Sequence, residues 1–337
     1  MAKTPIFGKK NVLVTGGAGF IGSALCESLL KNNKVICLDD FSNSHLENIE
    51  HLLKDSDFEF VKVNINNPFN LEELPELDKF KIKFQGIQEI YHLACPTSAK
   101  NFDQFKLETL LANSIGTRQV LDLAVKYNAK VLLGSSSVVY GPRKSEAKIK
   151  EEELGLVDNL SPRACYDEGK RFAETMFATY SQIYKLDIRI ARIFRTFGPR
   201  LKLFDGQMIT DFIVDAVNGR DLVIYGDESF SSSLVYIGDL VDGLMKIMNA
   251  PTISGPINLG DDRSYFLKDV AEFIIKTLGS TSQLKFDKPL AFMTPLGLPD
   301  ITRAKEELGW FPVVSLEEGL KKTIDYTVAH EKMVGVR

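Results

Sequence analysis

The sequence predicts an α/β fold: a doubly wound parallel sheet followed by a smaller C-terminal α/β lobe that binds the substrate. Through residues 1–195, short apolar runs alternate with helix-length amphipathic segments, a pattern that indicates parallel β-α-β units. Beyond Gly198-Pro199 the elements become shorter and are separated by Gly and Pro. We therefore expect two domains, residues 1–195 and 196–337, with some segments of the second returning to the first.

The expected elements follow the apolar pattern in order. A short apolar run bounded by turn residues suits a buried strand, and a longer amphipathic segment suits a helix. The predicted strands cover residues 12–15, 35–39, 58–63, 89–94, 130–135 and 187–193. The predicted helices cover residues 21–30, 107–127 and 163–184.

Composition excludes several classes of function. A net charge of −4 in 337 residues offers no basic surface for nucleic acid. The first ten residues contain no apolar signal core, and no run of about 18 apolar residues occurs, so we expect a cytoplasmic protein with no membrane segment. The four cysteines and four histidines do not cluster, which argues against a metal site and against a Ser-His-Asp triad.

A glycine-rich turn follows the first predicted strand. Gly16, Gly19 and Gly22 form a G-x-x-G-x-x-G variant of the Rossmann phosphate-binding turn. Glycine permits a tight turn and a close approach of the pyrophosphate to the N-terminus of the next helix. Asp39 ends the second predicted strand, at the distance where an acid that binds the adenosine ribose is expected. Its charge opposes a 2′-phosphate, so the predicted cofactor is NAD rather than NADP.

Tyr166 and Lys170 form a Tyr-x-x-x-Lys pair on a predicted helix. The spacing of four places them on one face, where the lysine ammonium favours ionisation of the tyrosine. Ser136, at the end of a predicted strand, is the candidate that hydrogen-bonds the substrate hydroxyl. A packed ring and a solvated charge would give the same spacing. The order of glycine turn, serine-rich strand end and Tyr-Lys pair favours the catalytic interpretation.

From about Asn11 to Tyr326, the sequence resembles the extended short-chain dehydrogenase/reductase (NAD-dependent epimerase/dehydratase) family, whose members remodel nucleotide-linked sugars. The motif at 161–171, SPRACYDEGKR, is similar to the corresponding helix of UDP-glucuronate decarboxylases (UDP-xylose synthases). Residues 191–194, 196–200 and 299–301 support the same resemblance.

The resemblance implies removal of the sugar C4 hydroxyl proton by Tyr166, and a 4-keto sugar. It also implies a nucleotide diphosphate sugar as substrate, with UDP as the expected nucleotide. Asn113 is expected near the nicotinamide, and a homodimer is expected whose four-helix interface uses residues 107–127 and 163–184. The expected catalytic residues are Ser136, Tyr166 and Lys170. The expected cofactor-binding residues are Gly16, Gly19, Phe20, Ile21, Gly22, Asp39, Asn64, Ile65, Leu93, Ala94, Asn113, Tyr166 and Lys170.

Several residues depart from the family pattern. Val138 stands where the decarboxylases have a glutamate, and C4 epimerases commonly have small or apolar residues there. Arg195 replaces an asparagine, while Ser232 and Gly297 replace arginines. We expect Arg195 to bind the diphosphate, since a guanidinium can hold phosphate oxygens bidentately. The expected substrate-binding residues are Ser137, Arg195, Arg200 and Tyr225, the last as an aromatic face for the base.

These departures favour a C4 epimerase or oxidoreductase over a decarboxylase. Decarboxylation needs groups that handle a carbanion, and the glutamate is absent, whereas epimerisation needs only that the 4-keto sugar turn over in its pocket. UDP-glucuronate decarboxylation remains the alternative. A catalytically silent NAD-binding sensor or scaffold is the alternative of another class, and the presence of Ser136, Tyr166 and Lys170 argues against it.

Overall fold

A seven-stranded parallel sheet forms the centre of the larger part of the molecule. The computed structural model describes residues 8–97, 102–143, 145, 147–289 and 296–334. The strand order is β11-β6-β5-β4-β1-β2-β3, and every neighbouring pair is parallel. The strands are β1 (Asn11–Thr15), β2 (Lys34–Asp39), β3 (Phe58–Lys62), β4 (Glu89–His92), β5 (Lys130–Ser136), β6 (Ile188–Ile193) and β11 (Pro256–Leu259).

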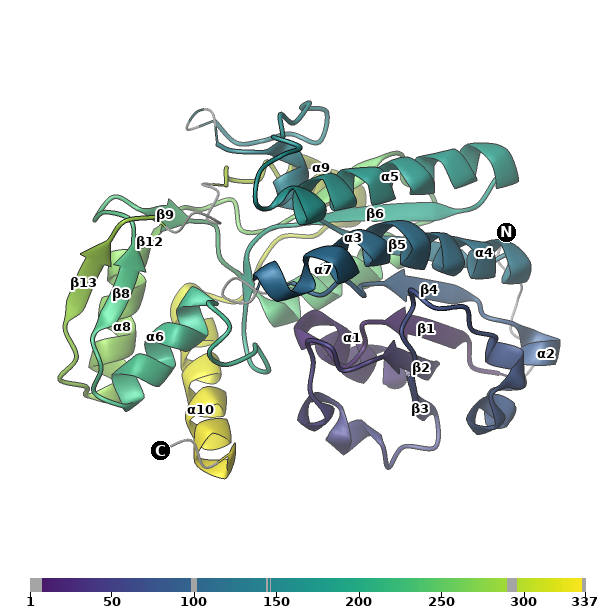
Figure 1. Ribbon diagram of the computed structural model, residues 1–337, viewed down its shortest axis with the longest axis horizontal. Helices are drawn as coiled ribbons and strands as arrows, with labels where there is room; N and C mark the ends of the chain where they lie inside the picture. The colour runs from purple at the N-terminus through teal and green to yellow at the C-terminus, as the bar shows by residue number, and fades with distance from the viewer. Residues whose placement is uncertain (1–7, 98–101, 144, 146, 290–295, 335–337) are drawn as a thin grey trace.

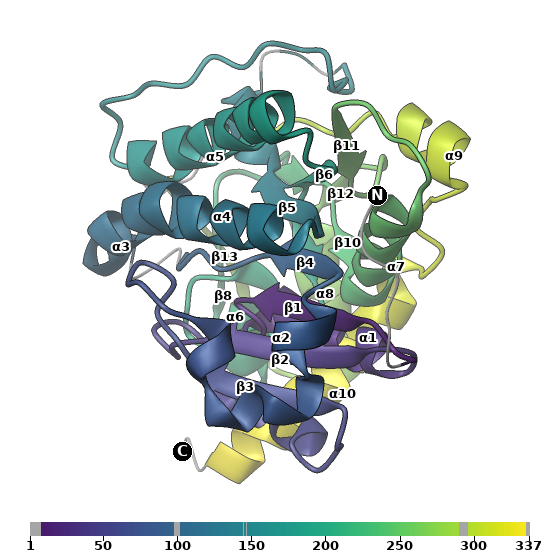
Figure 2. The same cartoon turned by 90° about the vertical axis from the view of Figure 1, so that its right-hand side faces the viewer.

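Helices cover both faces of the sheet (Figure 2). Because successive side chains of a strand point to opposite faces, Val12 and Val14 enter one hydrophobic core and Leu13 enters the other. The first core contains residues of α1 (Phe20–Leu30), α7 (Ile237–Asn249) and α9 (Thr302–Leu308). The second contains residues of α4 (Thr117–Tyr127) and α5 (Ala164–Tyr184). The predicted doubly wound α/β fold is therefore confirmed.

A smaller lobe lies beside the sheet, at the left of Figure 1. Its own hydrophobic core contains residues of three helices: α6 (Met208–Val217), α8 (Leu267–Leu278) and α10 (Leu316–Val334). Its short strands pair as β8 (Leu222–Tyr225) with β13 (Leu284–Asp287), β7 (Thr196–Phe197) with β10 (Val235–Tyr236), and β9 (Ser231–Ser232) with β12 (Tyr265–Phe266).

The predicted element over residues 107–127 differs from the structure. In place of one uninterrupted helix, α3 (Lys106–Leu111) is followed by a π-helical turn, Ala112–Gly116, and then by α4. The hydroxyl of Thr117 donates to the Ala112 carbonyl at 3.0 Å, so a side chain satisfies a carbonyl at the interruption. Interruptions of this kind are frequent at functional sites. The short helix α2 (Ile82–Gln85) precedes β4.

The second half of the chain contributes to both parts. Although β11 lies within the segment predicted for the second lobe, it pairs with β6 and completes the edge of the large sheet. Helices α7 and α9 also pack on that sheet. In the part of the chain that the structure describes, no helix combines the length and the apolar character needed to cross a membrane.

Candidate active site

The predicted glycine turn lies between β1 and α1. Gly16 has a φ of +71°, and a Cβ there would lie 2.7 Å from the Ala94 backbone nitrogen. A Cβ on Gly22 would lie 2.0 Å from the Gly16 carbonyl oxygen. These two glycines are therefore required by the packing of the turn itself. Gly19 is different, because the nearest neighbour of a Cβ there would be the Gly16 oxygen at 3.3 Å.

Gly19 is also the residue immediately before α1, at its N-cap position, and no side chain caps this helix. The first turn of α1 contains no acidic residue either. A helix N-terminus with open N–H groups attracts an anion. The space beside Gly19 and the uncapped helix therefore suit the pyrophosphate of a dinucleotide.

Asp39 ends β2 beside this turn, and its carboxylate is held by three donors. Oδ2 accepts from the Ala18 backbone N–H at 3.0 Å. Oδ1 accepts from the Phe41 N–H at 3.0 Å and from the Ser44 hydroxyl at 2.7 Å. Burial raises the pKa of Asp39, and the three hydrogen bonds oppose that rise. Of the roughly four lone-pair sites of a carboxylate, the one that remains on Oδ2 can accept from a ribose hydroxyl.

A cavity of about 580 Å³ brings the predicted site residues together at the carboxyl ends of the strands. In folds of this class, ligands bind at that edge of the sheet. Of the predicted residues, Asn113 alone is absent from the lining. The predicted residues that line the cavity are Gly16, Gly19, Phe20, Ile21, Gly22, Asp39, Asn64, Ile65, Leu93, Ala94, Ser136, Ser137, Tyr166, Lys170, Arg195, Arg200 and Tyr225.

The predicted catalytic residues meet where β5 ends against α5. Ser136 and Tyr166 both line the cavity there, and the Lys170 ammonium lies 5.9 Å from the centroid of the tyrosine ring. Lys170 is buried and donates to the Gly134 carbonyl at 2.9 Å. Burial raises the pKa of Tyr166 to about 12, whereas the polar side chain of Ser136 and the charge of Arg163 lower it. A further positive charge near the phenol would favour its ionisation.

Asn113 lies behind this group, on the π-helical turn. Its amide donates to the Thr109 carbonyl at 2.8 Å and lies 3.1 Å from Cys95 Sγ. A Cβ on Gly169 of α5 would lie 3.0 Å from the Asn113 amide nitrogen, so the two helices approach closely at this point. The expected position of Asn113 near the nicotinamide stays a prediction.

Cys95 and His92 come from the end of β4. Cys95 lines the cavity and contributes to the raised pKa of Tyr166. The scattered positions of the four cysteines in the sequence did not predict that one of them would line the site. His92 is fully buried between the hydroxyls of Thr15 and Thr117, at 2.8 and 3.1 Å. Burial lowers the pKa of His92 to about 3, so its ring is neutral near pH 7. Its two hydrogen bonds connect β4 with β1 and with α4.

The substrate side of the cavity contains Ser137, Val138, Arg195 and Tyr225. Val138 is 4% exposed and lies in the 3-10 turn that follows β5. Arg200 also reaches the cavity, but its guanidinium forms an ion pair with Glu27 of α1 and lies 3.2 Å from His51 Nε2.

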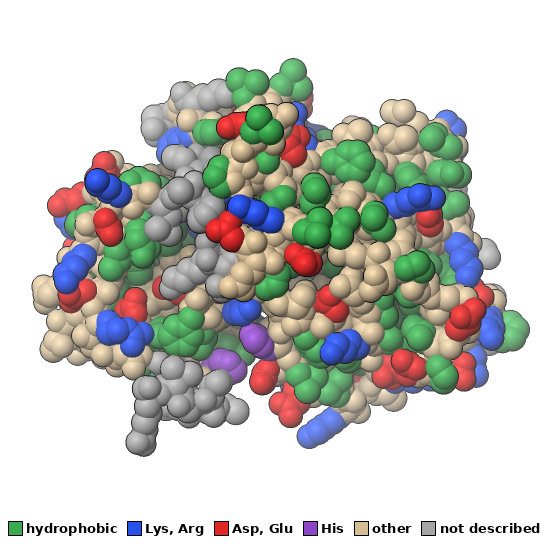
Figure 3. Space-filling model, viewed as in Figure 1, with side chains coloured by type: hydrophobic (Ala, Val, Ile, Leu, Met, Phe, Trp, Pro, Cys, Tyr) green, Lys and Arg blue, Asp and Glu red, His purple; other side chains and the backbone are tan. Residues whose placement is uncertain are grey.

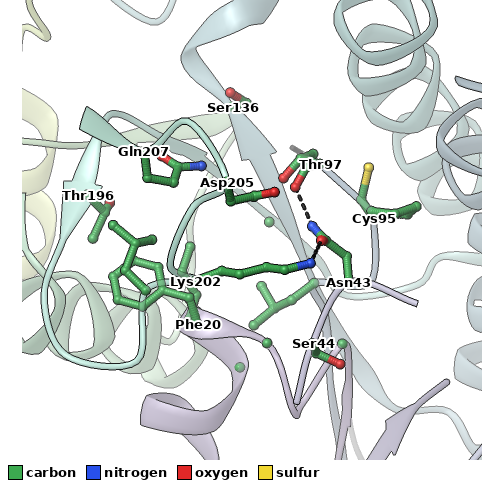
Figure 4. A pocket seen from close by; sticks show the side chains of 18 of the residues that line it. Phe20, Asn43, Ser44, Cys95, Thr97, Ser136, Thr196, Lys202, Asp205 and Gln207 are labelled. Atoms are coloured by element: carbon green, nitrogen blue, oxygen red, sulfur yellow. Dashed lines mark hydrogen bonds between the residues drawn. The ribbon is translucent and has the colours of Figure 1, made fainter. Parts of the chain in front are cut away.

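Lys202 was not predicted from the sequence. It extends toward the loop after β2 and donates to Asn43 Oδ1 at 2.6 Å, and Asn43 in turn donates to the Thr97 carbonyl (Figure 4). These contacts connect the segment that follows β7 to the cofactor half of the cavity.

Comparisons with known proteins agree with this geometry. The model of the NAD dependent epimerase/dehydratase family matches residues 12–260. UDP-glucuronic acid decarboxylase 1 of Xenopus tropicalis is 39% identical over 319 residues, which are 94% of this chain and 72% of that protein.

Two solved structures are also similar. UDP-glucose 4-epimerase of Thermotoga maritima, with UDP-glucose, has a TM-score of 0.83 at 25% identity. UDP-glucuronic acid 4-epimerase of Bacillus cereus, in complex with UDP-glucuronic acid and NAD, has a TM-score of 0.83 at 27% identity. Each alignment covers 95% of this chain and 99% of the other.

Proposed function

The chain belongs to the NAD-dependent epimerase/dehydratase family, and from this premise we propose that it oxidises the sugar of a nucleotide diphosphate sugar at C4. It is an enzyme that uses NAD. The product of this first step is a 4-keto sugar. We further propose that the enzyme is a C4 epimerase or oxidoreductase, which reduces the keto sugar on its other face or releases it.

Different residues would bind different parts of the cofactor. The glycine turn and Asp39 would hold the cofactor, the turn at its pyrophosphate and Asp39 at its adenosine ribose. When bound, NAD supplies the acceptor for the C4 hydrogen and the donor for its return. The carboxylate of Asp39 opposes a 2′-phosphate, and equal affinity for NADP would contradict this role.

Three side chains would handle the proton of the C4 hydroxyl. Ser136 accepts or donates a hydrogen bond at that oxygen, and Tyr166 takes its proton as general base. Lys170 favours the phenolate through its charge. These roles are supported by the shared position of the three side chains in the cavity lining and by the 5.9 Å between the Lys170 ammonium and the centroid of the Tyr166 ring.

The presence of Val138 is the observation that supports C4 epimerisation or oxidoreduction over decarboxylation. Its buried isopropyl group lines the cavity at the end of β5, the position where the decarboxylases are expected to have a glutamate. A valine neither carries a proton nor stabilises a carbanion. Oxidation at C4 does not need an acid at this position, whereas loss of the C6 carboxylate leaves an enolate that must be protonated at C5, and Val138 cannot supply that proton.

The test is product analysis by NMR after incubation of the NAD-loaded enzyme with UDP-glucose and with UDP-glucuronate. We expect the C4 epimer or the 4-keto sugar from at least one substrate, and slow or absent release of carbon dioxide from UDP-glucuronate. Brisk formation of carbon dioxide and UDP-xylose would contradict the role given to Val138.

UDP-glucuronate decarboxylation is the second candidate function. It is supported by the 39% identity to a UDP-glucuronic acid decarboxylase and by the SPRACYDEGKR motif at residues 161–171. The same NMR experiment separates the two candidates, because decarboxylation removes C6 and epimerisation keeps it.

We also propose that two copies of the chain pair through α3, α4 and α5. Hydrophobic side chains gather over these helices on the face shown in Figure 3. The exposed ones include Leu107, Leu110, Ile115, Phe172 and Ile183. Such a patch marks an interaction surface, and a second copy offers the same apolar helices in return. A monomer in sedimentation at micromolar concentration would contradict this assembly.

A further inference from the structure

Five cationic side chains line the cavity, and four of them contact an oxygen acceptor. Lys170 donates to the Gly134 carbonyl and Lys202 to Asn43. The other two form ion pairs, Arg163 with Asp167 at 3.4 Å and Arg200 with Glu27.

Arg195 is the exception. It lies between β6 and β7, half-buried. Among the described residues, the polar contact of its guanidinium is with Met208 Sδ, 4.0 Å from Nη1, and no carboxylate pairs with it. A cation that has lost part of its hydration without gaining an anion is costly. The position of Arg195 therefore suits an anion that comes from outside the chain.

A second positive charge lies close to Arg195. Burial lowers the pKa of Arg195 to about 10, and repulsion by Arg163 acts in the same direction. With a pKa of about 10, the Arg195 guanidinium remains charged near pH 7. The Arg163 guanidinium lies 5.9 Å from the centroid of the Tyr166 ring, so Arg163 adjoins the residue proposed to act at C4, and Arg195 lines the same cavity.

The positions where the family pattern has arginines do not supply this charge. The Ser232 hydroxyl donates to the Ser233 carbonyl at 3.2 Å. A Cβ on Gly297 would lie 2.3 Å from Ile149 Cδ1, so Ile149 fills the space of a side chain there. Neither residue lines the cavity.

We propose that Arg195, together with Arg163, binds an anionic oxygen group of the nucleotide sugar beside Tyr166 and selects substrates that carry it. This inference rests on the proposed function for the identity of the ligand. The group is either a phosphate of the diphosphate or a carboxylate on the sugar, and a guanidinium can bind both bidentately.

The test is calorimetric titration of the NAD-loaded enzyme with UDP, UDP-glucose and UDP-glucuronate. Arg195→Gln is expected to weaken binding of at least one of them by about 10- to 100-fold, the effect of losing a charged hydrogen bond. An equal loss for all three assigns Arg195 to the diphosphate. A loss confined to UDP-glucuronate assigns it to the sugar carboxylate.

Two variants control for folding and for charge in general. Arg195→Lys keeps the charge, and we expect it to retain more affinity than Arg195→Gln; equal losses in the two variants would indicate a packing role and overturn the proposal. Lys268→Gln removes a cation that pairs with Glu228, and neither residue lines the cavity, so this variant is expected to change nothing. Unchanged affinities for all three ligands in Arg195→Gln would also overturn the proposal.

These titrations are independent of turnover. If the enzyme shows no chemistry at C4 but Arg195→Gln loses affinity for UDP, the proposed function fails and the anion site stands. If C4 chemistry proceeds and Arg195→Gln binds all three ligands normally, the anion site fails alone.

Discussion

Replacing Tyr166 by phenylalanine is expected to lower turnover by about 100-fold or more, the usual contribution of a positioned general base. The phenol lines the cavity together with Ser136. Phenylalanine keeps the ring that lies near the charges of Arg163 and Lys170. Since the change removes an oxygen that does not hold the cofactor, the dissociation constant for NAD should stay within a fewfold of the parent value.

Tyr184→Phe is the matched control for this variant. Tyr184 ends the same helix, α5, but is 54% exposed and lies outside the cavity, so its loss should leave turnover unchanged. The measurement is steady-state turnover with the sugar nucleotide identified by NMR, together with NAD titration. If Tyr166→Phe keeps activity within a fewfold of the parent, another group takes the proton.

Replacing Lys170 by methionine is expected to impair both turnover and retention of NAD. Methionine keeps most of the buried stem but removes the ammonium that donates to the Gly134 carbonyl. The ammonium favours the Tyr166 phenolate, so its loss should raise the pKa of that phenol further. We expect turnover about 100-fold or more below the parent value, and weaker NAD binding because the ammonium is also placed to bind the nicotinamide ribose.

The pH profile separates this electrostatic role from a loss of packing. A higher pKa of Tyr166 means that less phenolate is present at a given pH, so the rising limb of kcat/KM should move to higher pH in Lys170→Met. Lys185→Met, at the exposed end of α5, is the matched control. A variant that loses activity equally at every pH would contradict the proposed effect of Lys170 on Tyr166.

The parts of the fold that could be predicted from the sequence are those with local signals. Strand β1 is an apolar run that leads directly into glycines, and its five residues are all buried. Helix α5 is long and amphipathic, and the predicted range of residues 163–184 differs from Ala164–Tyr184 by one residue. In both cases the pattern repeats over enough residues to indicate the element.

The elements that were missed depend on distant contacts. β11 has four residues, Pro256–Leu259, and it becomes a strand by pairing with β6, some 60 residues earlier in the chain. The π-helical turn Ala112–Gly116 interrupts a segment whose amphipathic pattern is continuous. A Cβ on Gly116 would lie 2.7 Å from Ile65 Cδ1, so the path of the helix here is set by tight packing against another segment.

The candidate site likewise contains residues that a local sequence signal predicts and residues that only distant contacts bring to the cavity. Gly16, Asp39, Tyr166 and Lys170 were found because their spacing along the chain follows the chemistry of a bound dinucleotide and a proton transfer. Lys202 reaches the cavity through a contact with Asn43, 159 residues earlier, and a single lysine in an irregular segment gives no local signal. The ion pair of Arg200 with Glu27 likewise joins residues from the two halves of the chain.

The most direct test of chemistry at C4 is rapid mixing of the NAD-loaded enzyme with a UDP-sugar that carries deuterium at C4, monitored by the absorbance of NADH. We predict a transient rise in NADH that is slower with the C4-deuterated sugar than with the unlabelled sugar, and no such slowing with deuterium at C3. We also expect Tyr166→Phe to suppress the rise. A rise that is slowed by deuterium at C3 and not at C4, or no rise with any UDP-sugar that binds, would contradict the proposed oxidation at C4.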